Sequence, residues 1–442
     1  MELEKFYNPH LYRAIKSYIP IAIGVIVEVV CGENGSSALT EESFLIARLA
    51  SAKELAALPE YSACVTALLA DPKIKSQLWT MVGSAGLRTR SSDASALMSR
   101  LVHLGLPRGT YTFNQEYFDA AYQTFEQAFY DEYLKYDVIA PLHNILITTS
   151  LRLSEEFEIS PLTDDELDPA RFPNTSLRSE FHVWGDPCAI RSTFRIRKIV
   201  GNNVEINRSD DAADQKRFEE TTVRVDEVVN ALRLFGADTV YYIAIIFRTP
   251  EWLFSDERVF RTRMHAPVSL TYEQDESWLL EFSKFWQLLQ SDQIRKRKAL
   301  VQAIRRFGYA LERPFNEDRL VDFIIACESL FLSDSPAQRN HSNTLAQRVA
   351  YLLSNNAAGR TKVFQNIKHA YKFRNAVVHA SPRTVRIKDE QGDPIEVEQF
   401  VGIIQEYTHR ALRLMIERAA DVDEKEPLFQ WNTLILNQNA PC

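Results

Sequence analysis

From residue 277 onward, apolar residues recur at the spacing of helices. Five segments with this spacing are followed by a sixth, longer one; they cover residues 278–289, 294–311, 318–332, 345–353, 362–380 and 397–420. Each has an apolar face that has to be buried, so the segments must pack against one another. We therefore expect an all-α helical bundle at 276–425 and a C-terminal tail at 426–442. Thr344 and Gln347 have capping-box spacing and predict a helix start there.

Residues 1–150 predict mostly helix. Two segments, 41–58 and 114–136, carry apolar and aromatic faces at helical spacing. The apolar run at 19–30 fits a buried strand or a buried helix equally well.

Residues 180–250 are predicted to be rich in strands. The segment 189–197 alternates apolar and polar residues, and 239–247 is a β-branched and aromatic run suited to a buried strand. A short amphipathic helix is expected at 225–235, between these two segments. The fold class is thus predicted to be α+β, with a mixed α/β N-terminal region at 1–270 before the helical bundle.

Composition narrows the class of protein. At 442 residues the chain is too long for one ordinary core, and its net charge of −8 excludes a generally basic nucleic-acid coat while allowing a local basic groove. Five scattered cysteines fit a reducing compartment, and the apolar run 19–31 is too short to span a bilayer. No histidine spacing or glycine loop typical of metal or phosphate sites occurs. We expect a cytoplasmic protein with no metal, no cofactor and no membrane segment.

Three sequence blocks stand out in the helical half. Residues 371–379 read Tyr-Lys-Phe-Arg-Asn-Ala-Val-Val-His, which places a permanent cation, an amide and a group that titrates near neutral pH close together. Chance supplies an Arg-x4-His match about once in such a chain, so its surroundings must decide. The segment 318–331 ends in Glu-Ser-Leu-Phe, and the segment 345–353 carries Arg348.

In these three blocks, in this order, the chain resembles the HEPN superfamily, most closely its ApeA-like branch. The resemblance covers about 150 of the 442 residues. It implies a metal-independent endoribonuclease that works as a homodimer, with two Arg-Asn-x3-His motifs facing one composite cleft. The chain departs from toxins silenced by AMP transfer, because Ala380 and Ser381 follow the histidine where those toxins have a His-x-Tyr extension.

The resemblance implies that Arg374, Asn375 and His379 are catalytic. RNA carries its own nucleophile, the 2′-OH, so the protein has to move protons and stabilise charge on phosphorus. His379 would be the general base or acid, and Arg374 would clamp the phosphate. Asn375 lies about one helical turn from the histidine and would orient it or the phosphate. Val377 and Val378 are expected to face the core.

Glu328, Arg348 and Tyr371 are expected to support this motif. Glu328 lies in a helix that is apolar almost all round, so we expect it to be buried with a cationic partner. Pairing with Arg374 would position the catalytic group, whereas pairing with Arg348 would be purely structural. We favour Arg348.

A cationic run extends from residue 294 to residue 313, with Glu312 as its one anion. It offers candidate RNA-binding residues, which together with a lysine beside the motif are Arg295, Arg297, Lys298, Arg305, Arg306 and Lys372. The competing interpretation is a helix face that pairs with acidic residues elsewhere, such as those between 155 and 168. That acidic, proline-bearing stretch reads as a surface linker or lid, and it could also mask the cationic run.

We therefore expect a regulated RNase of antiviral defence or abortive infection, whose N-terminal region senses a phage or cellular trigger. A non-catalytic HEPN module for dimerisation, or for nucleotide or partner binding, is the main alternative. A third is an enzyme with its chemistry in the N-terminal region. If the chain is a ribonuclease, its expected partner is RNA.

Overall fold

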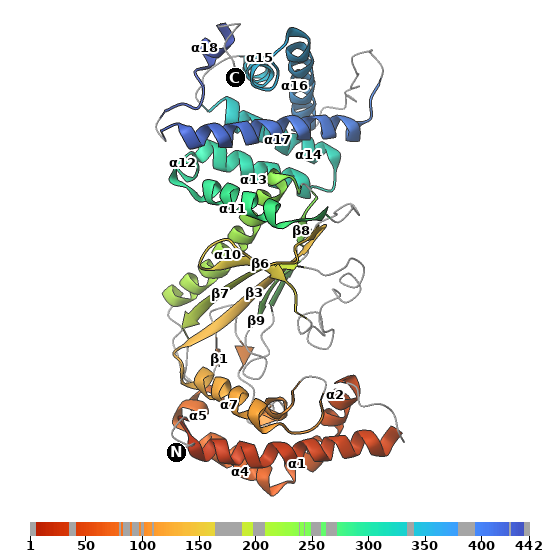
Figure 1. Ribbon diagram of the computed structural model, residues 1–442, viewed down its shortest axis with the longest axis vertical. Coiled ribbons are helices and arrows are strands. Elements are labelled where there is room, and N and C mark those ends of the chain that lie inside the picture. The colour runs from red at the N-terminus through yellow and green to blue at the C-terminus, as the bar shows by residue number, and fades with distance from the viewer. Residues whose placement is uncertain are drawn as a thin grey trace.

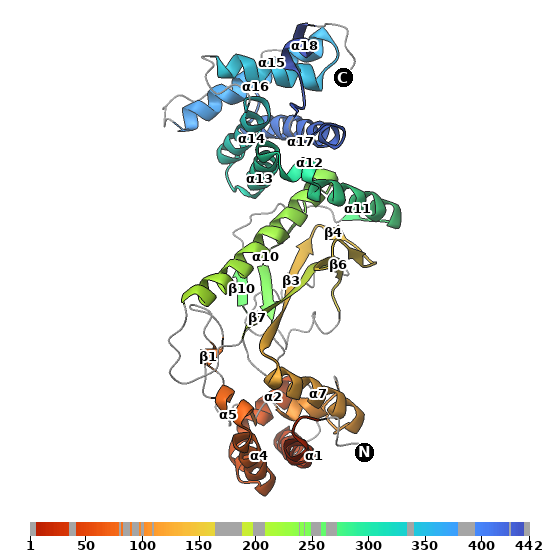
Figure 2. The same ribbon diagram turned by 90° about the vertical axis from the view of Figure 1, so that its left-hand side faces the viewer.

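The computed structural model describes sixteen stretches of the chain, and the fold is described for these alone. They are residues 6–34, 41–78, 81–82, 89–90, 97–98, 101–107, 110–163, 188–197, 208–237, 239–242, 244–248, 258–261, 272–333, 340–378, 394–423 and 426–436. The molecule is elongated: helices lie at the N-terminal end, a sheet and one long helix in the middle, and further helices at the C-terminal end (Figures 1 and 2). One core of buried side chains runs through all three parts. The predicted α+β class is confirmed.

The N-terminal part is built on one long helix, α1. Its helices are α1 (Pro9–Asn34), α2 (Glu41–Ala50), α3 (Ala52–Ala56), α4 (Pro59–Ala70), α5 (Pro72–Leu78) and α7 (Gln115–Tyr130), with a 3-10 turn η2 (Val102–Gly105). Leu11, Ile15, Tyr18 and Ile26 of α1 are fully buried, at helical spacing. The run that fitted either a strand or a helix is therefore a helix. By length and composition alone Pro9–Cys31 could also cross a membrane, a test that core helices of soluble proteins pass as well.

A buried carboxylate fixes the start of α1. Glu126 of α7 is 1% exposed and accepts hydrogen bonds from the backbone N–H groups of Tyr7 and Asn8, at 2.7 and 2.5 Å. These donors precede the first turn of α1 and have no carbonyl partner within the helix. Burial raises the pKa of Glu126, while both backbone hydrogen bonds act in the opposite direction. The carboxylate thus ties α7 to α1.

The central sheet has the strand order β10-β9-β3-β7-β6-β5, antiparallel throughout, with β8 also paired to β3. Its strands are β3 (Tyr133–His143), β5 (Leu151–Arg152), β6 (Phe157–Pro161), β7 (Cys188–Arg197), β8 (Tyr241–Tyr242), β9 (Ala244–Arg248) and β10 (Arg258–Arg261). Two short pairs lie apart from it, β1 (Met81–Val82) with β2 (Thr89–Arg90) and β4 (Ile145–Leu146) with β11 (Tyr272–Glu273). The predicted strands at 189–197 and 239–247 are confirmed as β7 and as β8 with β9.

The prediction of helix as far as residue 150 was wrong beyond Tyr130. Asp131 ends α7 in extended backbone, and β3 starts two residues later as a central strand of the sheet. The acidic stretch is likewise partly strand, since β6 occupies 157–161. Of its acidic residues, Asp164, Asp165, Glu166 and Asp168 lie outside the described residues.

One long helix, α10 (Arg208–Phe235), covers one face of the sheet. Its Phe218 packs against Tyr136, Phe194 and Phe247 of β3, β7 and β9, with ring centroids 4.9–5.4 Å apart. The predicted helix at 225–235 is the last part of this 28-residue helix. Beyond the sheet, α10 continues into the C-terminal helices (Figure 2).

The C-terminal part is entirely helical among its described residues. It consists of α11 (Glu276–Gln290), α12 (Asp292–Arg295), α13 (Lys298–Glu312), α14 (Asn316–Phe331), α15 (His341–Leu353), α16 (Ala357–Val378), α17 (Val397–Asp421) and α18 (Trp431–Leu436). All six predicted helical segments are helices, although 294–311 is divided between α12 and α13. The expected start at Thr344 was wrong, because α15 begins at His341 after Asn340. The last helix, α18, lies in the predicted tail.

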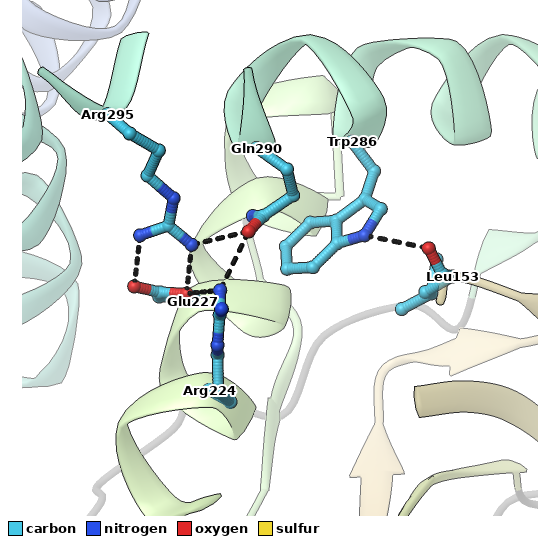
Figure 3. A network of polar contacts seen from close by, with 6 residues as sticks. All are labelled: Leu153, Arg224, Glu227, Trp286, Gln290 and Arg295. Carbon is cyan, nitrogen blue, oxygen red and sulfur yellow. Dashed lines mark hydrogen bonds and ion pairs between the residues drawn. The ribbon is translucent and has the colours of Figure 1, made fainter. Parts of the chain in front are cut away.

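A polar network joins the middle part to the bundle (Figure 3). Arg295 of α12 makes two hydrogen bonds of 2.6 Å to the carboxylate of Glu227 on α10. Arg224 of α10 donates to the same carboxylate at 2.9 Å and to Gln290 of α11 at 2.7 Å. A two-bonded arginine–carboxylate pair fixes orientation as well as distance. The bundle therefore has a defined position on α10.

A second, more buried network lies nearly two turns further along α10. Arg233 is 1% exposed; it donates to the backbone carbonyl of Val240 at 2.8 Å and pairs with Glu312 of α13 at 3.0 Å. Nearby, the hydroxyl of Tyr242 donates to Asp226. Burial is the main reason that the pKa of Asp226 is raised to about 6, and the charge of Glu312 adds to it.

This raised pKa predicts a pH-dependent stability. The folded chain binds a proton at Asp226 more tightly than the unfolded chain does. The stabilisation that protonated Asp226 gives the folded state is therefore complete below pH about 4, and it is lost as pH rises through about 6. Asp226→Asn keeps the oxygen that accepts from Tyr242 but cannot ionise. Between pH 4 and pH 7, wild type should lose on the order of 3 kcal/mol of unfolding free energy relative to Asp226→Asn, measured by urea denaturation.

Asp292→Asn is the matched control, because Asp292 is exposed on α12. The free energy of unfolding of Asp292→Asn should change with pH in the same way as that of wild type. If the free energy of unfolding of Asp226→Asn also follows that of wild type over this pH range, the fold does not raise the pKa of Asp226.

Candidate ribonucleolytic site

The motif and the glutamate block come together in space. α16 carries Tyr371, Arg374 and Asn375 and packs against α14, which carries Glu328. The core side of α16 is formed by buried residues at helical spacing, which are Val363, Ile367, Ala370 and Phe373. Arg374 lies four residues after Ala370 and seven after Ile367, so its side chain leaves the helix on this same face and reaches α14.

Arg374 is held between two partners. One terminal nitrogen lies 3.3 Å from Glu328 Oε2, and the other donates to Asn375 Oδ1 at 3.0 Å. The side chains of Arg374 and Glu328 are 24% and 22% exposed. Arg374 Nε is buried and has no hydrogen-bond partner among the described residues. The guanidinium is therefore oriented by a carboxylate and an amide.

The preference for an ion pair between Glu328 and Arg348 was wrong. Arg348 is 6% exposed and donates to the backbone carbonyl of Phe331, at the end of α14. Its guanidinium also lies over the ring of Trp431, 5.3 Å from the centroid. Arg348 thus holds α18 to the bundle, and Glu328 is left to position Arg374.

Tyr371 lies next to this pair, one turn before Asn375. Burial and the neighbouring Glu328 carboxylate raise the pKa of Tyr371. Its phenol is therefore neutral wherever RNA is stable. Tyr371 can donate or accept a hydrogen bond at the site but does not supply a charge.

A cleft of about 510 Å³ opens along the other side of α16. Its walls come from one face of that helix and from the start of α15, and they are Ser342, Phe364, Gln365, Lys368, His369, Tyr371, Lys372 and Asn375. Lys368, Lys372 and Asn375 are spaced four and three residues apart, so they lie in one row along the helix. Asn375 therefore belongs to both the cleft and the arginine cluster, whereas Arg374 does not line the cleft.

Sequence reasoning missed Lys368 and His369. Their spacing from Lys372 and Asn375 was visible in the predicted helix 362–380, but the cleft depends on α15, whose position could not be read from the sequence. Lys368 also contacts Asn343 of α15, which ties the two walls together.

His379 lies outside the described residues, since the description of α16 ends at Val378. Its predicted role stays a prediction. Val377 packs against the core as expected, but Val378 is 53% exposed, so the expectation that both valines face the core was wrong for Val378.

Most arginines of the predicted RNA-binding run are engaged within the protein. Arg295 pairs with Glu227, and Arg306 pairs with Asp322 of α14 at 2.9 Å. Arg297 donates to three backbone carbonyls at the end of α17 and beyond it, those of Val422, Asp423 and Glu426. Lys298 and Arg305 are exposed on α13, and Lys372 is exposed at the cleft. Among the described residues, the carboxylates that pair with these arginines lie in α10 and α14.

In the described part of the chain, no group of three or more His, Cys, Asp or Glu side chains could hold a metal ion. Comparisons of the chain with protein families, with curated proteins and with solved structures find no match.

The pairing of Glu328 predicts a specific pattern of energetic coupling. In a double-mutant cycle with Glu328→Ala and Arg374→Ala, the coupling free energy should be about 1 kcal/mol, because the pair is only about a quarter exposed. Glu328→Ala combined with Arg348→Ala should be additive within about 0.5 kcal/mol. Urea denaturation of the five variants and wild type measures both values. Coupling to Arg348 but not to Arg374 would reverse the assignment.

Proposed function

We propose that this chain is a metal-independent endoribonuclease of the HEPN kind. The observation that carries the proposal is Arg374, held by Glu328 and Asn375 at the edge of a cationic cleft on the same helix. An oriented guanidinium is suited to a phosphate diester, because its planar fork can donate to two phosphate oxygens at once.

The proposed reaction needs no added nucleophile. The 2′-oxygen of the ribose attacks the adjacent phosphorus, the bond from phosphorus to the 5′-oxygen breaks, and a 2′,3′-cyclic phosphate and a 5′-hydroxyl result. One proton leaves the 2′-OH and one is delivered to the 5′-oxygen. We assign these transfers to His379, with the histidine of a second copy as the natural partner in a composite homodimeric site.

Arg374 is assigned to the charge that develops on the phosphate in the transition state. Glu328 has a positioning role: it restrains the guanidinium and neutralises part of its charge in the free protein. Asn375, which lies between the arginine and the cleft, would orient the phosphate or the histidine. The neutral phenol of Tyr371 completes the set as a hydrogen-bonding group.

The biological setting that we propose is cytoplasmic and defensive. An RNase that cuts cellular RNA is toxic, so it has to be controlled, as in abortive infection. The helices and sheet of the N-terminal region would receive the phage or cellular trigger, and the bundle would carry the dimer contacts.

The second candidate is a non-catalytic module that binds nucleotides or partners through the same bundle. It is favoured by one observation: Arg374 is directed at α14 and does not line the cleft. In that case Arg374 and Glu328 are a structural ion pair, and the cleft binds without cleaving.

Cleavage of cellular RNA in EDTA separates the two candidates. Full-length wild type should cut RNA, with or without extract from phage-infected cells as a source of trigger. Arg374→Ala and His379→Ala should each lower the rate by about a hundredfold or more, because each removes a group that acts on the transition state. The rate is measured from cleaved ends on denaturing gels.

Arg418→Ala and His10→Ala are matched controls, since both residues are exposed on other helices, α17 and α1. They should cut like wild type. Wild type that stays inert under both conditions would favour the module. Activity that requires a metal and survives both motif substitutions would place the chemistry in the N-terminal region.

A further inference from the structure

The cations that could bind RNA can be separated from those that already pair with groups of the protein itself. In the cationic run, Arg306 and Arg313 share the carboxylate of Asp322, which is 4% exposed. Arg295 and Arg297 hold the bundle to α10 and to the chain after α17. Releasing any of these arginines to a phosphate would remove a hydrogen-bond partner from a carboxylate or carbonyl of the fold, which offsets part of what the phosphate contact returns.

The cleft on α16 offers cations without that cost. Lys372 is exposed, and Lys368, although it contacts Asn343, bonds there to a neutral amide that water can replace. The two lysines lie on successive turns of one helix, so their Cβ atoms are about 6 Å apart, and side chains that start at this spacing can reach consecutive phosphates of a nucleic-acid strand. The row ends at Asn375, which contacts Arg374.

The same cleft has aromatic walls. Phe364, His369 and Tyr371 line it together with the lysines, within a volume of about 510 Å³. Bases stack on such rings only when they are free of a duplex, because an A-form helix keeps its bases stacked on one another and buries their faces. Cations in a row beside aromatic side chains are the combination that binds single strands without reading their sequence.

We propose that the cleft between α15 and α16 binds the single-stranded RNA substrate, with Lys368 and Lys372 on successive phosphates and a base against Phe364. The cationic run on α12 and α13 is then part of the fold and not the RNA track. This assignment rests on the proposed ribonuclease function for the identity of the ligand, and it leads the strand toward Arg374.

Binding of an uncleavable strand tests the assignment separately from catalysis. A short, fluorescently labelled RNA with 2′-O-methyl groups lacks the nucleophile, so it reports affinity even if the chain cuts nothing. Fluorescence anisotropy with the full-length protein gives Kd over a series of salt concentrations. Lys368→Gln/Lys372→Gln should lower the slope of log Kd against log salt by about 1.4, the value for two phosphate contacts on a single strand.

Phe364→Leu keeps an apolar side chain against the core but removes the ring, and it should weaken binding about fivefold or more. Lys216→Gln/Lys284→Gln is the charge-matched control, because both lysines are exposed in surface ion pairs on α10 and α11. It should leave Kd and slope unchanged. Thermal unfolding of each variant verifies that it is folded.

Three results would overturn the assignment. The first is a slope that falls in Lys298→Gln/Arg305→Gln but not in the cleft variant. The second is a labelled duplex that binds as tightly as the single strand. The third is a Kd insensitive to all these variants. Cleft-dependent binding with no cleavage by wild type would instead refute the ribonuclease and leave the cleft as the strand-binding site.

Discussion

Two carboxylates on the buried helix α14 determine which arginines of the bundle are held in ion pairs. α14 lies between α13, α16 and α17, and its side chains are buried on most sides. Asp322 and Glu328 both point out of this apolar helix at places where a neighbouring helix covers them. Asp322 is buried and has to be paired, because an unpaired buried charge costs several kcal/mol, whereas Glu328 is 22% exposed and only partly removed from water. Asp322 pairs with Arg306 of α13 and with Arg313, which directly follows that helix. Glu328 pairs with Arg374 of α16.

This division has a consequence for the net charge of −8. Most arginines in the densest group of cations in the chain bond to carboxylates or carbonyls of their own fold, whereas Lys298 and Arg305 are exposed. Two lysines line the cleft on α16, the exposed Lys372 and the partly buried Lys368, and the neutral side chains of Asn343 and Asn375 lie next to them. A modest number of exposed lysines in a concave site attracts a phosphate backbone more effectively than arginines already bound to carboxylates.

Much of the fold could be predicted from periodicity, and the exceptions have physical causes. The apolar spacing after residue 277 located every long helix of the bundle. The start of β3 was hidden, because the aromatic residues of α7 continue into Tyr133 and Tyr136 and mimic one helical face. The first half of α10 was missed because it is polar except for a few residues such as Phe218, whose burial depends on a sheet assembled from distant strands.

The candidate site could likewise be predicted only in part from the sequence. Periodicity placed Arg374 and Asn375 on a helix, and the order of the blocks indicated a family. The partner of Glu328 could not be deduced, since it depends on whether α15 or α16 passes the last turn of α14. Arg348 is closer in sequence, yet it faces the end of α14 and Trp431. The role of the cationic run was obscured for a similar reason, because Asp322 sits in a segment that otherwise reads as apolar.

The arrangement also restricts how the N-terminal region can control the bundle. α1, α4 and α7 lie at the opposite end of the molecule from α16, in both views of the ribbon (Figures 1 and 2). These helices therefore cannot cover the cleft of their own chain. Any influence they have on it must come from a second copy or pass through the middle part, for example through α10. That helix meets α13 so closely that a Cβ at Gly308 would overlap the side chain of Asn230, and α13 in turn packs on α14. A shift of α10 would thus act on the helix that holds Glu328, and through it on Arg374.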